Sequence, residues 1–124
     1  MRDVQKIDTD ILSVDYLSDI SGSPEHCKSS CHDFYEIFYA DSGAGTYYFE
    51  GKSLVIAAHT LILSRPREYH GYSFESSSGY SRYIVKFSSS AVSESNLQLI
   101  DRLLDGAGGV LYSHLSCASD ISEV

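Results

Sequence analysis

Residues 32–45 read His32-Asp33-Phe34-Tyr35-Glu36-Ile37-Phe38-Tyr39-Ala40-Asp41-Ser42-Gly43-Ala44-Gly45, and this stretch decides the fold. Its first part, up to Ala40, is rich in aromatic side chains and contains a β-branched one, both of which favour strands. The Asp-Ser-Gly-Ala-Gly run that follows is typical of a turn. Side chains on a strand alternate between its two faces, so we expect His32, Phe34, Glu36 and Phe38 on one face.

Further short strands surround this stretch, each ended by a turn signal. Glu50-Gly51 separates two extended runs and indicates a β-hairpin. Pro66 marks a loop before a later strand. The expected strands cover residues 34–40, 46–49, 52–56, 61–63, 69–74 and 80–87, with one or two lead-in strands within residues 1–20. Strands at this spacing are typical of a sandwich or barrel.

Two short helices are predicted behind the strands. Ser93 is a good N-cap, and the apolar residues that follow it recur at helical spacing until Gly106. A second helix is predicted over residues 110–118. The apolar faces would consist of Leu97, Ile100 and Leu104 in the first helix and of Leu111, Leu115 and Ala118 in the second. We therefore expect a β-barrel over residues 1–90 and a helical extension over residues 91–124.

Length, charge and cysteine content limit the classes of function. A chain of 124 residues is long enough for one domain. With 9 basic against 17 acidic side chains the formal net charge is −8, which disfavours contact with a nucleic-acid backbone. The charged N-terminus has no signal-peptide core, and no apolar run reaches the roughly 20 residues of a membrane span. Three cysteines make no disulfide framework. We therefore expect a cytoplasmic protein with reduced thiols.

Three ionisable side chains fall on apolar strand faces and indicate a pocket. His32 and Glu36 share one face, and His70 opens a later strand. If both faces look into the barrel, its closure brings two imidazoles and a carboxylate together between aromatic walls. The predicted pocket residues are His32, Glu36 and His70, with walls from Phe34, Tyr48 and Tyr72.

Arg82 is a further candidate ligand-binding residue. It alternates with Tyr83, Val85 and Phe87, so it faces the pocket only if those three side chains face outward. The sequence leaves both directions of this strand open.

Five motifs in this order resemble a known family. His32-Asp33-Phe34-Tyr35-Glu36, then six residues and Gly43, is similar to the first cupin motif, and Pro66-Arg67-Glu68-Tyr69-His70 is similar to a degenerate second one. The sequence pattern most closely resembles that of the N-terminal sensor domains of AraC-type transcriptional regulators. The five motifs are His32-Asp33-Phe34-Tyr35-Glu36-Ile37, Ser42-Gly43-Ala44-Gly45-Thr46-Tyr47-Tyr48, Glu50-Gly51-Lys52, Tyr69-His70-Gly71-Tyr72-Ser73-Phe74 and Ser81-Arg82-Tyr83-Ile84-Val85-Lys86-Phe87-Ser88. The resemblance covers residues 32–88.

The resemblance implies a mainly β, cupin-like double-stranded β-helix with short C-terminal helices. Such a domain binds a small polar effector such as a sugar, forms homodimers and catalyses no reaction. In family members it precedes a DNA-binding domain with two helix-turn-helix motifs, which is missing from this chain, so DNA contact is expected of the parent protein. The candidate dimerisation residues on the C-terminal helices are Leu97, Ile100, Leu104, Leu111 and Leu115.

Departures from the cupin pattern leave two other functions open. Ser30 stands where metal-binding cupins have their first histidine, and Arg67 replaces the glycine of the second motif. His32, Glu36 and His70 would still suffice for a two-histidine, one-carboxylate site for a divalent metal, as in an isomerase or dioxygenase. The other alternative is an interaction module whose barrel is filled by its own side chains.

Overall fold

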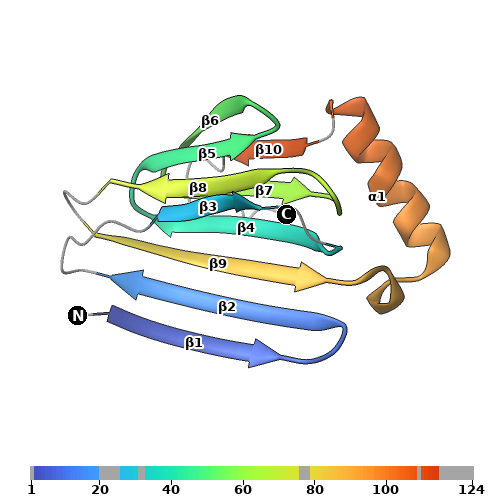
Figure 1. Ribbon diagram of the computed structural model, residues 1–124, viewed down its shortest axis with the longest axis horizontal. Helices are drawn as coiled ribbons and strands as arrows, with labels where there is room; N and C mark the ends of the chain where they lie inside the picture. The colour runs from blue at the N-terminus through green and yellow to red at the C-terminus, as the bar shows by residue number, and fades with distance from the viewer. Residues whose placement is uncertain (1, 20–25, 31–32, 76–78, 109, 115–124) are drawn as a thin grey trace, which may run out of the picture.

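Two antiparallel β-sheets face each other in the computed structural model, which describes residues 2–19, 26–30, 33–75, 79–108 and 110–114 (Figure 1). The six-stranded sheet has the order β1-β2-β9-β4-β7-β10, and the four-stranded sheet has the order β3-β8-β5-β6. The elements are β1 (Arg2–Asp8), β2 (Leu12–Asp19), β3 (His26–Ser30), β4 (Tyr35–Ser42), β5 (Gly45–Phe49), β6 (Lys52–Ile56), β7 (Thr60–Ser64), β8 (His70–Phe74), β9 (Tyr80–Phe87), the 3-10 turn η1 (Ser89–Ala91), α1 (Glu94–Gly106) and β10 (Val110–His114). The prediction of a mainly β chain is confirmed.

The predicted hairpin between β5 and β6 is confirmed, and its turn has a specific geometry. Glu50 and Gly51 both have positive φ, 44° and 79°, as a two-residue type I′ turn requires. At the start of β5 the neighbouring strand β8 comes so close that a Cβ on Gly45 would lie 2.1 Å from the carbonyl oxygen of Ser73. Only glycine fits there, so this position fixes how closely β5 and β8 pack.

The space between the two sheets is filled by apolar side chains. Strand β4 lies between β9 and β7, with Phe38 opposite Ile84 and Ile62. The Phe38 ring is fully buried, and its centroid lies 5.4 Å from that of Tyr47 and 5.0 Å from that of Tyr72 in the other sheet. The buried cluster contains Leu17, Phe38, Ala40, Tyr47, Phe49, Ile56, Ile62, Tyr72, Phe74, Tyr80 and Ile84.

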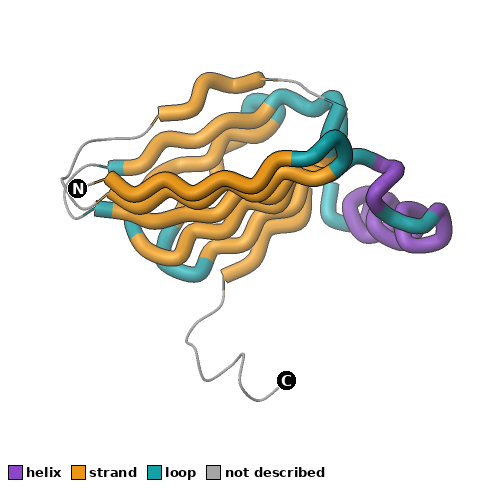
Figure 2. Tube along the Cα trace, turned by 90° about the horizontal axis from the view of Figure 1, so that it is seen from below, coloured by secondary structure: helices purple, strands orange, loops and turns teal. Residues whose placement is uncertain are grey.

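Helix α1 packs on the outer face of the six-stranded sheet, at one end of the strands (Figures 1 and 2). The Ser93 hydroxyl caps it by accepting a hydrogen bond from the Asn96 backbone amide. Leu104 is fully buried against Tyr35 and Phe87. The predicted stripe of Leu97, Ile100 and Leu104 therefore packs on this chain's own sheet. No helix of the described residues is long and apolar enough to cross a membrane.

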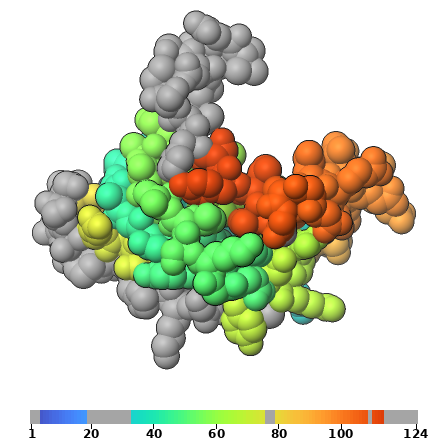
Figure 3. All heavy atoms as spheres, turned by 90° about the horizontal axis from the view of Figure 1, so that it is seen from above, coloured from blue at the N-terminus to red at the C-terminus, as the bar shows by residue number. Residues whose placement is uncertain are grey.

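The prediction of a second helix is wrong for residues 110–114, which form strand β10. This strand pairs antiparallel with β7, and the Tyr112 hydroxyl donates a hydrogen bond to the carbonyl of Val55, 2.7 Å away. Figure 3 shows β10 lying against the green atoms that include β6. The free edge of β7 completes the backbone hydrogen bonds of β10, so pairing overrides the local helical spacing. Leu111 packs in the cluster beneath α1, and Leu115 lies outside the described residues.

Candidate functional site

A row of polar side chains crosses the inner face of the six-stranded sheet, two residues along the strands from Phe38. Each member lies opposite the next in the strand register, and cross-strand partners point to the same face. The polar row consists of Asp8 in β1, Ser13 in β2, Lys86 in β9, Glu36 in β4 and Ser64 in β7. The register therefore gathers two carboxylates, two hydroxyls and one ammonium group from strands far apart in the sequence.

Glu36 and His70 form a buried pair that joins the two sheets. Glu36 is 4% exposed and His70 is 4% exposed, and the Nε2 atom of His70 lies 3.0 Å from the Oε2 atom of Glu36. The other ring nitrogen, Nδ1, lies 3.1 Å from the carbonyl oxygen of Glu68. Because a carbonyl oxygen only accepts hydrogen bonds, Nδ1 carries a hydrogen. When Nε2 is protonated as well, the pair is an imidazolium facing a carboxylate.

Opposing effects act on the charge of His70. Burial lowers its pKa, whereas the hydrogen bond and the charge of Glu36, together with the Glu68 carbonyl, raise it, and nearby Lys86 lowers it. The net result is a pKa of His70 above its ordinary value. The Tyr47 ring covers the imidazole in a parallel stack, with centroids 6.0 Å apart. The imidazolium is therefore stabilised by a specific partner inside the protein.

Ser64 adds an unused hydrogen-bonding group beside this pair. It is 1% exposed, and its hydroxyl has no hydrogen-bond partner among the described residues. A buried hydroxyl without a partner costs free energy, because it has lost its water. This atom is therefore a candidate contact for a bound polar molecule.

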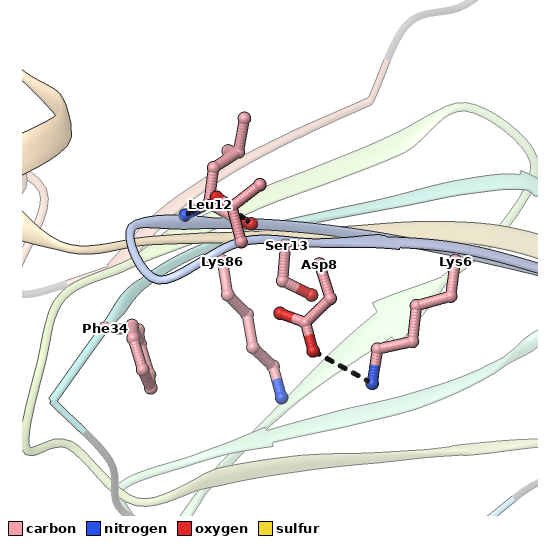
Figure 4. Close-up of a pocket in the computed structure, with 7 residues that line it drawn as sticks. Lys6, Asp8, Leu12, Ser13, Phe34 and Lys86 are labelled. Carbon is pink, nitrogen blue, oxygen red and sulfur yellow. Dashed lines mark hydrogen bonds and ion pairs between the residues drawn. The ribbon is translucent and has the colours of Figure 1, made fainter.

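A cavity of about 240 Å³ opens at the β1–β2 end of the polar row (Figure 4). Lys86 belongs to both the polar row and the cavity, because it lines the cavity and lies opposite Glu36 in the sheet. The cavity is lined by Lys6, Asp8, Thr9, Leu12, Ser13, Phe34 and Lys86. Most of these side chains are polar and come from the β1–β2 hairpin, whereas Phe34 supplies an aromatic wall ahead of β4.

Arg82 faces inward, because Tyr83, Val85 and Phe87, which alternate with it along β9, face outward. It does not line this cavity. Its guanidinium Nη1 lies 3.3 Å from the Asp15 carbonyl oxygen and 3.5 Å from the Asp15 carboxylate. It also lies over the Tyr72 ring, 5.8 Å from the centroid. These contacts hold Arg82 between β2 and β8, four residues along β9 from Lys86.

The structure changes the role of two of the three predicted aromatic residues. Tyr48 points away from the inner face and is 38% exposed, and its neighbour Tyr47 takes the inward position. Tyr72 is buried in the cluster between the sheets. Phe34 does line the cavity. The prediction of Tyr48 as a pocket wall is thus corrected, because the register of the β5–β6 turn sends Tyr47 inward.

The predicted metal triad is described only in part. His32 lies outside the described residues, and Glu36 and His70 contact each other directly. Within the described ranges no group of three histidine, cysteine, aspartate or glutamate side chains could hold a metal ion. Both nitrogens of His70 are engaged, so the ring would have to exchange a partner before it could bind a metal.

Sequence reasoning missed several of the residues that line the site. Lys86 could have been found, because it shares the strand face of Arg82 at a spacing of four. Lys6, Asp8 and Ser13 carry no comparable signal, since their place depends on the pairing of β2 with β9. Ser64 depends likewise on the pairing of β4 with β7.

Comparison with known families identifies the family of this chain. A family model described as the AraC-like ligand binding domain matches residues 20–108. No curated protein matches the chain.

Solved structures show the same fold at low sequence identity. A proposed mannose-6-phosphate isomerase from Ralstonia eutropha is 10% identical with a TM-score of 0.60, over 72% of this chain and 86% of that one. An RmlC-like cupin from Shewanella frigidimarina is 15% identical with a TM-score of 0.57, over 69% and 75%. An RmlC-like cupin with a double-stranded β-helix from Methanocaldococcus jannaschii is 13% identical with a TM-score of 0.59, over 71% and 81%. The predicted cupin-like double-stranded β-helix is confirmed, but its two sheets do not close into the expected barrel.

Proposed function

Because the chain belongs to the family of AraC-like ligand-binding domains, we propose that it is the effector-binding domain of a transcriptional regulator. The effector is a small polar molecule such as a sugar. DNA contact is made by a separate helix-turn-helix domain of the same regulator, and the protein acts in the cytoplasm, where that DNA lies. The domain itself catalyses no reaction.

The cavity at the β1–β2 end of the polar row is the observation that carries this proposal. Its volume of about 240 Å³ corresponds to roughly eight water molecules, which is room for a small metabolite. Its lining residues include charged groups and hydroxyls, and Phe34 offers an aromatic face. Small-molecule sites typically combine apolar walls with a few polar groups that fix the orientation of the ligand.

One route of contacts leads from the pair to helix α1 through β4. Tyr35 precedes Glu36 in β4 and points to the opposite face of the strand. Its hydroxyl donates a hydrogen bond of 2.7 Å to Asp101 on α1. Burial and this hydrogen bond to Asp101 raise the pKa of Tyr35 to about 12. A shift of β4 on ligand binding would therefore move an anchor of the helix.

A second route runs through the loop between β7 and β8. Glu68 accepts a hydrogen bond from His70 through its carbonyl and from Arg65 through its carboxylate, 3.2 Å from the Arg65 Nε atom. Arg65 also pairs with Asp105 on α1. Ligand binding changes a regulator only if the ligand binds two states differently. These two routes are where such states would differ.

The homodimer is part of this proposal, with the C-terminal segment as the interface. Leu97, Ile100 and Leu104 pack on the chain's own sheet. On the other side of α1, Leu99 and Leu103 are each 52% exposed. A second copy would cover these two side chains.

A ligand screen by differential scanning fluorimetry tests the proposal. A compound at a hundred times its Kd stabilises the folded protein by about 2.7 kcal/mol, which raises Tm measurably. We expect the shift to be lost in His70→Ala and kept in Tyr48→Phe, the matched control whose side chain points away from the site. The proposal is wrong if sugars and other small polar metabolites give no shift and His70→Ala changes no affinity.

A metal-dependent cupin enzyme is the second candidate function. One observation favours it, namely that a buried carboxylate and a buried imidazole meet 3.0 Å apart, a pairing also suited to acid–base or metal chemistry. The similar structure described as a mannose-6-phosphate isomerase is consistent with this reading. Stoichiometric metal in the purified protein that is lost in His32→Ala would support the enzyme and contradict the regulator.

A further inference from the structure

The cavity gathers positive charge in a strongly acidic chain. The formal net charge is −8, and the chain has four lysines, of which two, Lys6 and Lys86, line this one cavity. Asp8 is the acidic residue that lines it with them. Figure 4 shows the side chains of all three extending to the same side of the β1–β2 hairpin. The lining residues thus carry a charge of +1 within a protein that otherwise repels anions.

Lys86 has no ion-pair partner among the described residues that would neutralise it. It is half-buried on the inner face, and it makes no hydrogen bond or ion pair with a described residue. The nearest carboxylate across the strand, that of Glu36, faces His70. An anion in the cavity would supply an ion-pair partner that this half-buried ammonium group does not find among the described residues.

Lys6 is held only weakly. Its Nζ atom lies 4.0 Å from Asp8 Oδ2, and the two side chains are 56% and 64% exposed. Exposed pairs of this kind contribute little to stability, so the ammonium group can exchange Asp8 for a ligand at little cost. Lys6 can therefore serve as a second, adjustable contact to an anion.

The other lining groups fit the remainder of such a ligand. Ser13 stands opposite both Asp8 and Lys86 in the register, and its hydroxyl has no hydrogen-bond partner among the described residues. Thr9, in contrast, is used by the turn, where its hydroxyl donates to the Leu12 carbonyl at 2.9 Å. Phe34 is 38% exposed and offers an apolar face. The site thus combines cations with a hydroxyl and an aromatic wall.

We propose that the effector carries an anionic oxygen group, a carboxylate or a phosphate, which is bound by Lys86 and Lys6. This inference rests on the proposed ligand-binding function and names the chemical class of the ligand. Ser13 and Asp8 contact hydroxyl groups of the same molecule, and Phe34 packs on its carbon skeleton. A sugar acid or a sugar phosphate has all three features, whereas a neutral sugar lacks the first.

Isothermal titration calorimetry with paired probes tests the inference. The probes are glucuronate and galacturonate, the corresponding hexose phosphates, and neutral glucose and galactose. Binding of the acids alone or of the phosphates alone identifies the source of the anion and supports the inference in either case. A hydrogen bond to a charged group contributes about 1.5–3 kcal/mol, so we expect Lys86→Met to weaken anion binding by roughly 10- to 150-fold. Raising the salt concentration also weakens it.

Two further variants serve as controls. Lys86→Arg keeps the charge and should restore most of the affinity. Lys52→Gln makes the same change of net charge on the other sheet and should leave binding unchanged. Circular dichroism confirms that each variant is folded. Neutral sugars that bind as tightly as the acids, or anion binding that survives Lys86→Met, would overturn the inference and leave the proposed function standing. If no probe of either class binds and a wider metabolite screen is also negative, both fail.

Discussion

Two neighbouring rows on the inner face of the six-stranded sheet use the same strands differently. The apolar row, Ile84, Phe38 and Ile62, lies two residues from the polar row, about 7 Å along β9, β4 and β7. Both rows contain side chains that are almost fully buried. Tyr47 and Tyr72 of the other sheet close over Phe38, whereas the polar row ends at a cavity. Burial therefore does not distinguish the two rows. The difference is whether each side chain finds its partners within the chain.

The largest expected effect comes from opening the apolar row. Phe38→Ala removes a fully buried ring that contacts both sheets, and such a change costs about 3–5 kcal/mol of unfolding free energy. Urea denaturation measures it. Val55→Ala, at a side chain that is 66% exposed, is the matched control and should change stability by less than about 0.5 kcal/mol. A loss below about 1 kcal/mol in Phe38→Ala would mean that the apolar row is not closely packed.

The apolar row was the part that the sequence could predict. Phe38 and Ile84 lie in runs of aromatic and β-branched residues whose alternation requires only neighbouring positions. The polar row could be predicted only at Glu36 and at His70, its partner from the other sheet. Lys86 is not predictable in this way, because one strand alone does not show which of its faces is inward. That choice depends on contacts with strands distant in the chain.

The inward direction of β9 illustrates this limit. Arg82 is stable inside because Asp15 in β2 and Tyr72 in β8 both contact it. Neither partner is near it in sequence. The β10 region shows the same limit, since an unpaired edge of β7 converts residues 110–114 from an expected helix into a strand.

Removal of one partner from the buried pair should have the next largest effect. Glu36→Ala leaves the His70 imidazole without its acceptor, and a buried group deprived of its partner costs about 2–3 kcal/mol. Asp15→Ala breaks the other inward pair, but Arg82 keeps its contacts with the Asp15 backbone carbonyl and the Tyr72 ring, so we expect a smaller loss than in Glu36→Ala. Chemical denaturation of both variants measures the difference. Equal losses would mean that His70 depends no more on Glu36 than Arg82 depends on the Asp15 carboxylate.

The pH dependence of stability isolates the proton of His70. Its folded pKa is raised above the ordinary value of about 6.5, so the charged form is favoured by folding. This contribution is complete below about pH 6.5 and is lost as the pH rises through the folded pKa. We expect the free energy of unfolding to fall over that interval, by less than Glu36→Ala removes. Denaturation curves recorded across this range measure the slope, and His70→Gln should abolish the part that His70 contributes. If the slope is unchanged in His70→Gln, the pH dependence of stability comes from another titratable group.

Ser64→Ala should have the smallest effect on stability. It also separates folding from binding most clearly, because the two should change in opposite directions. The hydroxyl is buried without a partner in the described part of the chain, so its removal relieves a desolvation cost. We expect a gain of up to about 1 kcal/mol in unfolding free energy, where a change in the apolar row only destabilises. If the hydroxyl is kept for a ligand, the same variant weakens effector binding in calorimetry while the protein becomes more stable. A variant that is less stable and binds equally well would place Ser64 among the residues that only hold the fold, together with Phe38.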